Sequence, residues 1–294
     1  MTLGGRWYSS TSLLNTPIPA NPALSADNAT QIAWMVQNAV RAFEPTGNSV
    51  PSVYYATSAT PTVTVQVNFP TCNASQVQVP IPAGAMPGNG SSGDAEAPMV
   101  IASSATGEEW DLFKATPPMA APKSSGPVCP ATANWAATVL TRNSPGWTGT
   151  GTGPSYSASG ILGAGGLIRP RDTKMALGST WDHALTMSYP RVRNTFVAPA
   201  RQTDGPYTDA ASLPMGSRIQ LDPTFDVNGL AIPEWQRQML RTMQVYGIIV
   251  ADSGSAIHNE GYASVHASGY AWPWEAGGPV GISSTVVSRF RVLR

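Results

Sequence analysis

The clearest alternation of apolar and polar residues along the chain lies between Pro61 and Phe69. Val63, Val65 and Val67 fall on one side of an extended chain, and polar side chains fall on the other. Because successive side chains of a strand point to opposite faces, this pattern predicts a half-buried antiparallel strand. Similar shorter runs predict further strands near residues 77–79, 99–101, 109–113, 135–140, 166–169, 181–189, 194–199, 217–221, 248–252 and 286–293.

Two segments follow the helical period instead. From residue 27 to 43, apolar residues such as Ile32 and Met35 recur at the three- and four-residue spacing of one buried stripe. The second segment, 233–246, has the same spacing and carries Pro233 in its first turn, where proline is well tolerated. Together with the strands, these segments predict a mainly β fold: an antiparallel β-sandwich or jelly-roll-like core with two peripheral helices, about 27–43 and 233–246.

No internal repeat or clear linker divides the sequence. We therefore expect a single β-rich domain over residues 1–255, which begins with an extended, proline-rich segment. Residues 256–294 are predicted to form an aromatic, glycine-rich C-terminal extension that ends in a closing strand.

Charge is sparse, since Asp, Glu, Lys and Arg make up 12% of the chain, against about 25% in typical soluble domains. The formal net charge is +0, and no basic cluster is present, which argues against a nucleic-acid partner. No apolar run approaches the ~18 residues of a membrane helix, and the N-terminus does not read as a signal peptide. We expect a virion-surface or extracellular protein that does not insert into membranes.

Paired carboxylates are the candidates for catalysis. Glu109 and Asp111 are two residues apart on a predicted strand and therefore share a face. Glycoside hydrolysis uses two carboxylates, so an enzyme of this kind, or a polysaccharide lyase, would use Glu109, Asp111, Asp182 and His183. Two simpler interpretations stay open: the acidic residues cover a solvated sheet face, and His183 is a hydrogen-bonded core histidine.

Candidate ligand-binding residues are mostly aromatic. Trp272 and Trp274 flank a proline in a glycine-rich loop, where exposed aromatic rings are costly unless a partner subunit or a sugar ring covers them. Trp110 and Asp252 complete the predicted ligand-binding set. No metal or cofactor is expected, because histidines are few and the glycine-rich run 160–166 lacks the lysine of a phosphate-binding loop. Cys72 and Cys129 either form one disulfide or remain thiols.

Several motifs resemble a widespread, uncharacterised group of mostly actinobacterial, extracellular, β-rich proteins, and the chain is similar to an actinobacteriophage tail version of them. The motifs are Asn15–Asn21, Val79–Ala85, Ala158–Ile161, Gly166–Pro170, Asp182–Leu185, Pro214–Pro223 and Tyr246–Gly254. The resemblance implies a fold and a location but no activity. One departure is that members carry a histidine just before the strand at 99–101, where this chain has Ala97 and Pro98.

These observations favour a virion or cell-surface structural protein, similar to a phage minor tail protein. Its β domain would be of a carbohydrate-binding kind, directed at bacterial-envelope polysaccharide. The expected partners are that glycan, other copies of the chain, or other virion or surface proteins. Two alternatives remain: a secreted polysaccharide-cleaving glycoside hydrolase that uses paired carboxylates, and a structural adaptor without a ligand.

Overall fold

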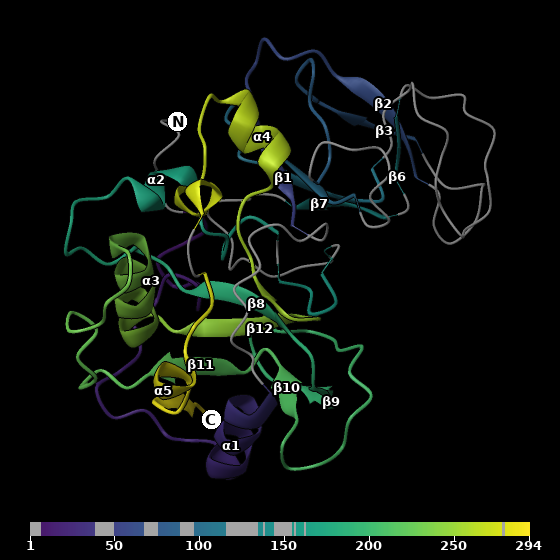
Figure 1. Cartoon of the computed structure of the whole chain (residues 1–294). Coiled ribbons are helices and arrows are strands. Elements are labelled where there is room, and N and C mark those ends of the chain that lie inside the picture. Colours follow the sequence, from purple (N-terminus) through teal and green to yellow (C-terminus); the bar gives the residue numbers. More distant parts are fainter. Residues whose placement is uncertain are drawn as a thin grey trace.

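The computed structural model describes residues 7–38, 50–67, 76–88, 97–115, 135–137, 139–143, 155, 157–161, 163–277 and 280–294. Over these residues the chain is mainly β, with fourteen strands, five α-helices and one 3₁₀ helix (Figure 1). The strands lie in four separate sheets, and none of these closes on itself within the described part of the chain. The prediction of a mainly β protein is confirmed. Cys72 and Cys129 lie outside the described residues.

The largest sheet has five strands in the order β13-β8-β12-β11-β14. They are β8 (Leu185–Tyr189), β11 (Arg218–Leu221), β12 (Ile248–Ser253), β13 (Ala256–Ile257) and β14 (Phe290–Val292). Strands β8 and β12 are parallel, whereas the other neighbours are antiparallel. Both edge strands come from residues 256–294, so the predicted C-terminal extension shares a sheet with the chain that precedes it.

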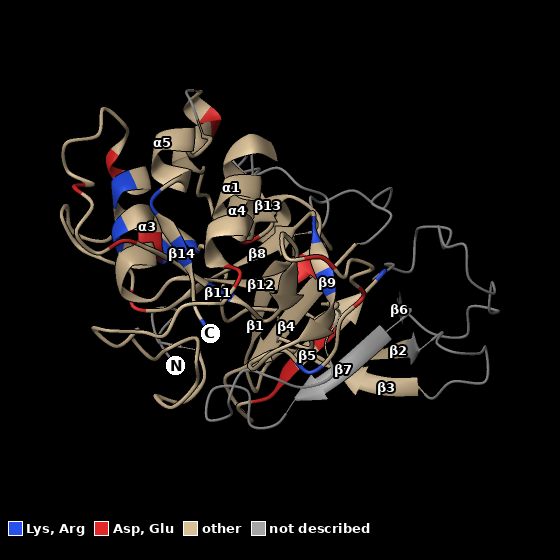
Figure 2. Cartoon of the chain, turned by 90° about the horizontal axis from the view of Figure 1, so that it is seen from below, with Lys and Arg blue, Asp and Glu red and all other residues tan. Residues whose placement is uncertain are grey.

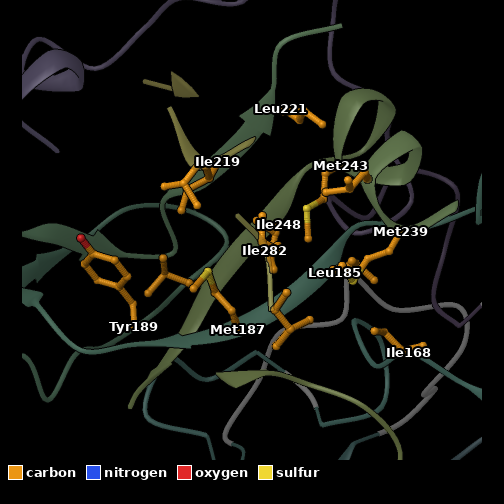
Figure 3. Close-up of a cluster of buried hydrophobic side chains, with 14 of the residues drawn as sticks. Ile168, Leu185, Met187, Tyr189, Ile219, Leu221, Met239, Met243, Ile248 and Ile282 are labelled. Carbon is orange, nitrogen blue, oxygen red and sulfur yellow. The ribbon is translucent and has the colours of Figure 1, made fainter. Parts of the chain in front are cut away.

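One face of this sheet packs against helix α3 (Glu234–Val245). Leu185, Met187 and Tyr189 alternate along β8 toward this face, and Met239 and Met243 come from the helix (Figure 3). Full burial of such side chains contributes about 1.5–3 kcal/mol each, before entropy is counted. The predicted helix at 233–246 is therefore confirmed, because its apolar stripe has this sheet to pack on.

A second sheet has four strands, β1 (Ser52–Ala56), β4 (Met99–Ser103), β5 (Glu109–Phe113) and β7 (Val139–Asn143), in the order β1-β4-β5-β7. A third joins β3 (Gln76–Val79), β2 (Val63–Val67) and β6 (Trp135–Ala137), and β9 (Val192–Phe196) pairs with β10 (Leu213–Met215). The strand predicted from the alternation at 61–69 is β2.

The prediction of antiparallel pairing is wrong for one pair of strands in each of the four sheets, and that pair is the whole of the β9-β10 sheet. Four pairs are parallel: β1 with β4, β2 with β6, β8 with β12, and β9 with β10. Alternation along a strand reports which face is buried but not the direction of the neighbouring strand. Parallel neighbours need long crossover connections, and the chain between β8 and β12, which contains α3, provides one.

The N-terminal segment lies between the two larger sheets. Trp7, Tyr8 and Leu14 share an apolar cluster with Val100 of β4 and Ile249 of β12. The same cluster includes side chains from residues 161–167. The N-terminal segment and side chains from residues 161–167 therefore pack between the two sheets. They also bring the Tyr8 hydroxyl and the Gly163 amide to β5.

The remaining helices are short, except α1 (Asn28–Asn38). It corresponds to the predicted helix at 27–43, whose last five positions lie outside the described residues. The others are α2 (Pro170–Thr173), α4 (Tyr262–Ala267), the 3₁₀ helix η1 (Pro273–Ala276) and α5 (Ser284–Val287). Elements of four to six residues complete too few turns to show a helical period in sequence. Within the described ranges, no helix has the length and apolar character needed to cross a membrane.

Candidate functional site

Glu109 and Asp111 form a buried carboxylate pair on β5. Most of the ribbon is uncharged, and Figure 2 shows acidic residues in red and basic residues in blue. Glu109 and Asp111 are both 0% exposed, and they occupy alternate positions of β5 and therefore share one face of the strand. The Tyr8 hydroxyl donates to Glu109 Oε2 at 3.0 Å, while Ser155 Oγ and the Gly163 amide donate to Asp111 Oδ2 at 2.8 and 3.1 Å. The alternative of a solvated acidic face is therefore wrong, because Tyr8, Ser155 and Gly163 contact the two carboxylates and both are fully buried.

Burial dominates the electrostatics of this pair. It raises the pKa of Glu109 well above the usual range, and the neighbouring charge of Asp111 raises it further. Burial also raises the pKa of Asp111 to about 6, against the opposing effect of the donors Ser155 and Gly163. Both effects on Glu109 favour its protonated form.

A second cluster surrounds Asp172, which is 0% exposed. Its Oδ2 accepts the Arg169 amide at 2.8 Å and lies 3.2 Å from His183 Nε2. The other ring nitrogen of His183 lies 2.9 Å from the Ala184 carbonyl oxygen. Despite burial, Arg169 and then His183 hold the pKa of Asp172 below its usual range. The interpretation of His183 as a hydrogen-bonded core histidine is confirmed.

Asp182 belongs to this second cluster and not to the face of β5. It precedes β8 in a bend, so the predicted strand beginning at residue 181 is too long. Its carboxylate pairs with Arg171, which keeps the pKa of Asp182 below its usual range although burial opposes this. The structure thus brings the four predicted catalytic residues together as two pairs, each with its own partners.

The donor set of the second cluster also bears on metal binding. One ligand atom from each of Asp172, Asp182 and His183 lies within 4.8 Å of the others. However, Arg169 and Arg171 already contact these carboxylates. Two guanidinium groups supply the positive charge that a cation would bring, so the arrangement fits an ion-pair network better than a metal centre.

The predicted ligand-binding tryptophans lie in the core. Trp110, Trp272 and Trp274 are 4%, 1% and 6% exposed. The rings of Trp272 and Trp274 stack with centroids 4.5 Å apart, and Trp274 packs on Trp235 of α3 at 5.0 Å. The expectation that a partner or a sugar covers this loop is wrong, because the chain's own helix covers it.

Asp252, at the end of β12, is partly buried. One carboxylate oxygen accepts the Ser253 amide at 2.8 Å, and the other accepts the Ala158 amide at 3.3 Å. The second contact connects Ala158 to the end of β12. Asp252, the fourth residue of the predicted ligand-binding set, therefore has a structural role.

A surface cluster that the sequence did not predict lies beside β9; we call Trp34, Arg191, Tyr207 and Asp209 the Arg191 platform. The Arg191 guanidinium lies 4.5 Å from the Tyr207 ring centroid and 5.6 Å from that of Trp34. Its Nε and Nη2 atoms donate to the two oxygens of Asp209 at 3.2 and 2.7 Å. Tyr207 is 36% exposed, and the Asp209 side chain 42%.

Tyr189 lies beneath this platform. Its ring is 0% exposed and meets Trp34 edge-on, with centroids 5.7 Å apart. Burial raises the pKa of its hydroxyl. It has no hydrogen-bond partner among the described residues. Buried hydroxyl groups normally have one, so Tyr189 carries an unused polar group on a ring that packs against Trp34.

Comparison with protein-family models, curated proteins and solved structures gave no match. The resemblance to actinobacterial extracellular proteins therefore stays a prediction.

Proposed function

We propose that the chain is a virion or cell-surface protein, similar in role to a phage minor tail protein, that binds bacterial-envelope polysaccharide at the Arg191 platform. The platform itself is the observation that carries the proposal. A partly exposed tyrosine ring offers an apolar face to the C–H groups of a sugar ring. Arg191 and Asp209 offer charged donors and acceptors to sugar hydroxyls at its edge.

The charge of the platform favours a neutral glycan. Arg191 and Asp209 neutralise each other, and their ion pair fixes the guanidinium against Tyr207 before any ligand arrives. A site that is already ordered loses less entropy on binding. In this proposal a sandwich-like core of the four- and five-stranded sheets is the rigid support, a view favoured by the apolar cluster that they share. Other copies of the chain, or other surface proteins, would array several platforms.

Truncation of Tyr207 tests this proposal. We expect Tyr207→Ala to weaken binding to insoluble actinobacterial cell-wall arabinogalactan by at least about tenfold, since central aromatic contacts contribute about 2 kcal/mol. Binding is measured as protein depleted from the supernatant over a range of polysaccharide concentrations.

Leu177→Ala is the matched control, because Leu177 is an apolar side chain that is 84% exposed and lies in the chain between α2 and β8. It should bind as the wild type does. Equal binding by the Tyr207 variant and the wild type would exclude the platform, and no binding by the wild type would favour the adaptor without a ligand.

The carboxylate pair supports a second candidate function, a polysaccharide-cleaving hydrolase. Raised pKa values at two adjacent carboxyl groups are typical of acid–base centres. Glu109 would be the proton donor and Asp111 the base. Both side chains are closed off from solvent, so catalysis would require the covering segments to move aside.

A further inference from the structure

A serine and a histidine outside the sites described above lie side by side at one edge of the five-stranded sheet. Ser188 is on β8, and His258 directly follows β13, which pairs with β8. Ser188 Oγ lies 2.8 Å from His258 Nε2, and His258 Nδ1 lies 3.1 Å from Thr186 Oγ1. This order of hydroxyl, imidazole and orienting group is the arrangement that activates a serine nucleophile.

The His258 imidazole is in the neutral form, which can accept a proton. Desolvation lowers the pKa of His258 to about 4, so the imidazole is neutral at pH 7. When Nδ1–H donates to Thr186, the Nε2 lone pair faces the Ser188 hydroxyl. Thr186 is then a positioning residue, which holds the ring in this tautomer.

A glycine packs against Ser188, which is itself 7% exposed. Gly254 has φ +137°, and a Cβ there would lie 3.0 Å from Ser188 Cβ and 3.5 Å from its Oγ. His258 keeps some solvent exposure, and Gly254 is exposed. A glycine therefore borders the serine hydroxyl at a position where any side chain would crowd it.

We propose that Ser188 and His258 form a nucleophile–base pair that cleaves small acyl esters, a site separate from the Arg191 platform and independent of the proposed function. Ser188 Oγ bonds to the carbonyl carbon, and its proton passes to His258 Nε2. The ester C–O bond breaks, and the alcohol leaves with that proton. Water then hydrolyses the acyl-serine, which releases a carboxylic acid and restores the hydroxyl.

Active-site labelling tests the pair without assuming a natural substrate. The folded wild-type chain is incubated with a fluorophosphonate, and the modified residue is mapped by mass spectrometry. We expect one adduct, on Ser188, and hydrolysis of p-nitrophenyl acetate that is lost on labelling. His258→Gln should slow labelling by about 100-fold or more, the usual contribution of a general base.

Ser253→Ala is the matched control, since Ser253 is an exposed serine on β12 whose hydroxyl donates to Asp204. It should label at the wild-type rate. An unlabelled Ser188 in folded wild-type protein would overturn the proposal, and so would equal labelling rates in the wild type and the His258 variant. Neither result depends on whether the chain binds glycan.

Discussion

Asp172→Ala is expected to reduce the free energy of unfolding by about 3–5 kcal/mol, the usual effect of breaking a buried ion pair from one side. Asp172 is fully buried and is the acceptor for Arg169 and His183, whose side chains are also buried. Without it, two polar groups lose their partner in a region that water does not reach. A typical domain has about 5–15 kcal/mol of stability, so this single change is a large fraction of the total.

Urea unfolding at pH 7 measures this effect, and Asp182→Ala is the matched control. Asp182 belongs to the same cluster, but its side chain is 33% exposed. Because exposed ion pairs contribute about 1 kcal/mol or less, the control should cost far less than Asp172→Ala. If Asp172→Ala folds too poorly for urea unfolding, the Asn variants are compared instead. A lower yield of folded Asp172→Asn than of folded Asp182→Asn would then have the same meaning. Equal losses in the two variants would contradict a central role for Asp172.

Glu260→Gln is expected to remove a pH-dependent loss of stability. Burial raises the pKa of Glu260 to about 7, although Ser264 donates to the carboxylate at 2.8 Å. The folded chain therefore keeps a proton that the unfolded chain releases between about pH 4.5 and 7. Stability from this group is complete below about pH 4.5 and falls as the pH rises through 7. The shift of about 2.5 pH units corresponds to about 3 kcal/mol.

The stability of the Gln variant relative to the wild type should therefore rise by about 3 kcal/mol between pH 4 and pH 8, measured by urea unfolding at several pH values. Glu234→Gln is the contrasting variant. Arg237, and then the Gly178 amide and Arg241, lower the pKa of Glu234 to about 2, so its removal should destabilise more at pH 8 than at pH 2. A flat difference between the wild type and Glu260→Gln across the pH range would show that Glu260 is ionised in the folded chain.

The sequence predicted elements whose pattern is local. The alternation at 61–69 identifies β2, and the stripe of α3 identifies a helix with one buried face. Strand direction was not predictable in this way, because β8 and β12 are brought together as parallel neighbours by the long chain between them. The four-residue helices α2 and α5 complete about one turn each, which is too short for a period.

Within the candidate sites too, contacts between residues close in sequence could be predicted, and contacts between distant residues could not. The spacing of Glu109 and Asp111 correctly placed their side chains together, since strand geometry is local. Their burial depends on Tyr8, which is 101 residues from Glu109 along the chain. The Arg191 platform joins residues of α1, the turn after β8 and the chain beyond β9, and no local pattern connects these. Trp272 looked exposed because its loop is rich in glycine, yet Trp274 and Tyr270 pack on it in the core.

The most direct test of the account is to incubate the purified chain with actinobacterial cell-wall arabinogalactan and to measure pelleted protein and released reducing sugar in the same tubes. The account predicts that the wild type and Glu109→Gln pellet equally, that Tyr207→Ala stays in the supernatant, and that no reducing sugar is released. Sugar release that is lost in Glu109→Gln, with pelleting unaffected by Tyr207→Ala, would contradict it and establish the buried carboxylate pair as the functional centre.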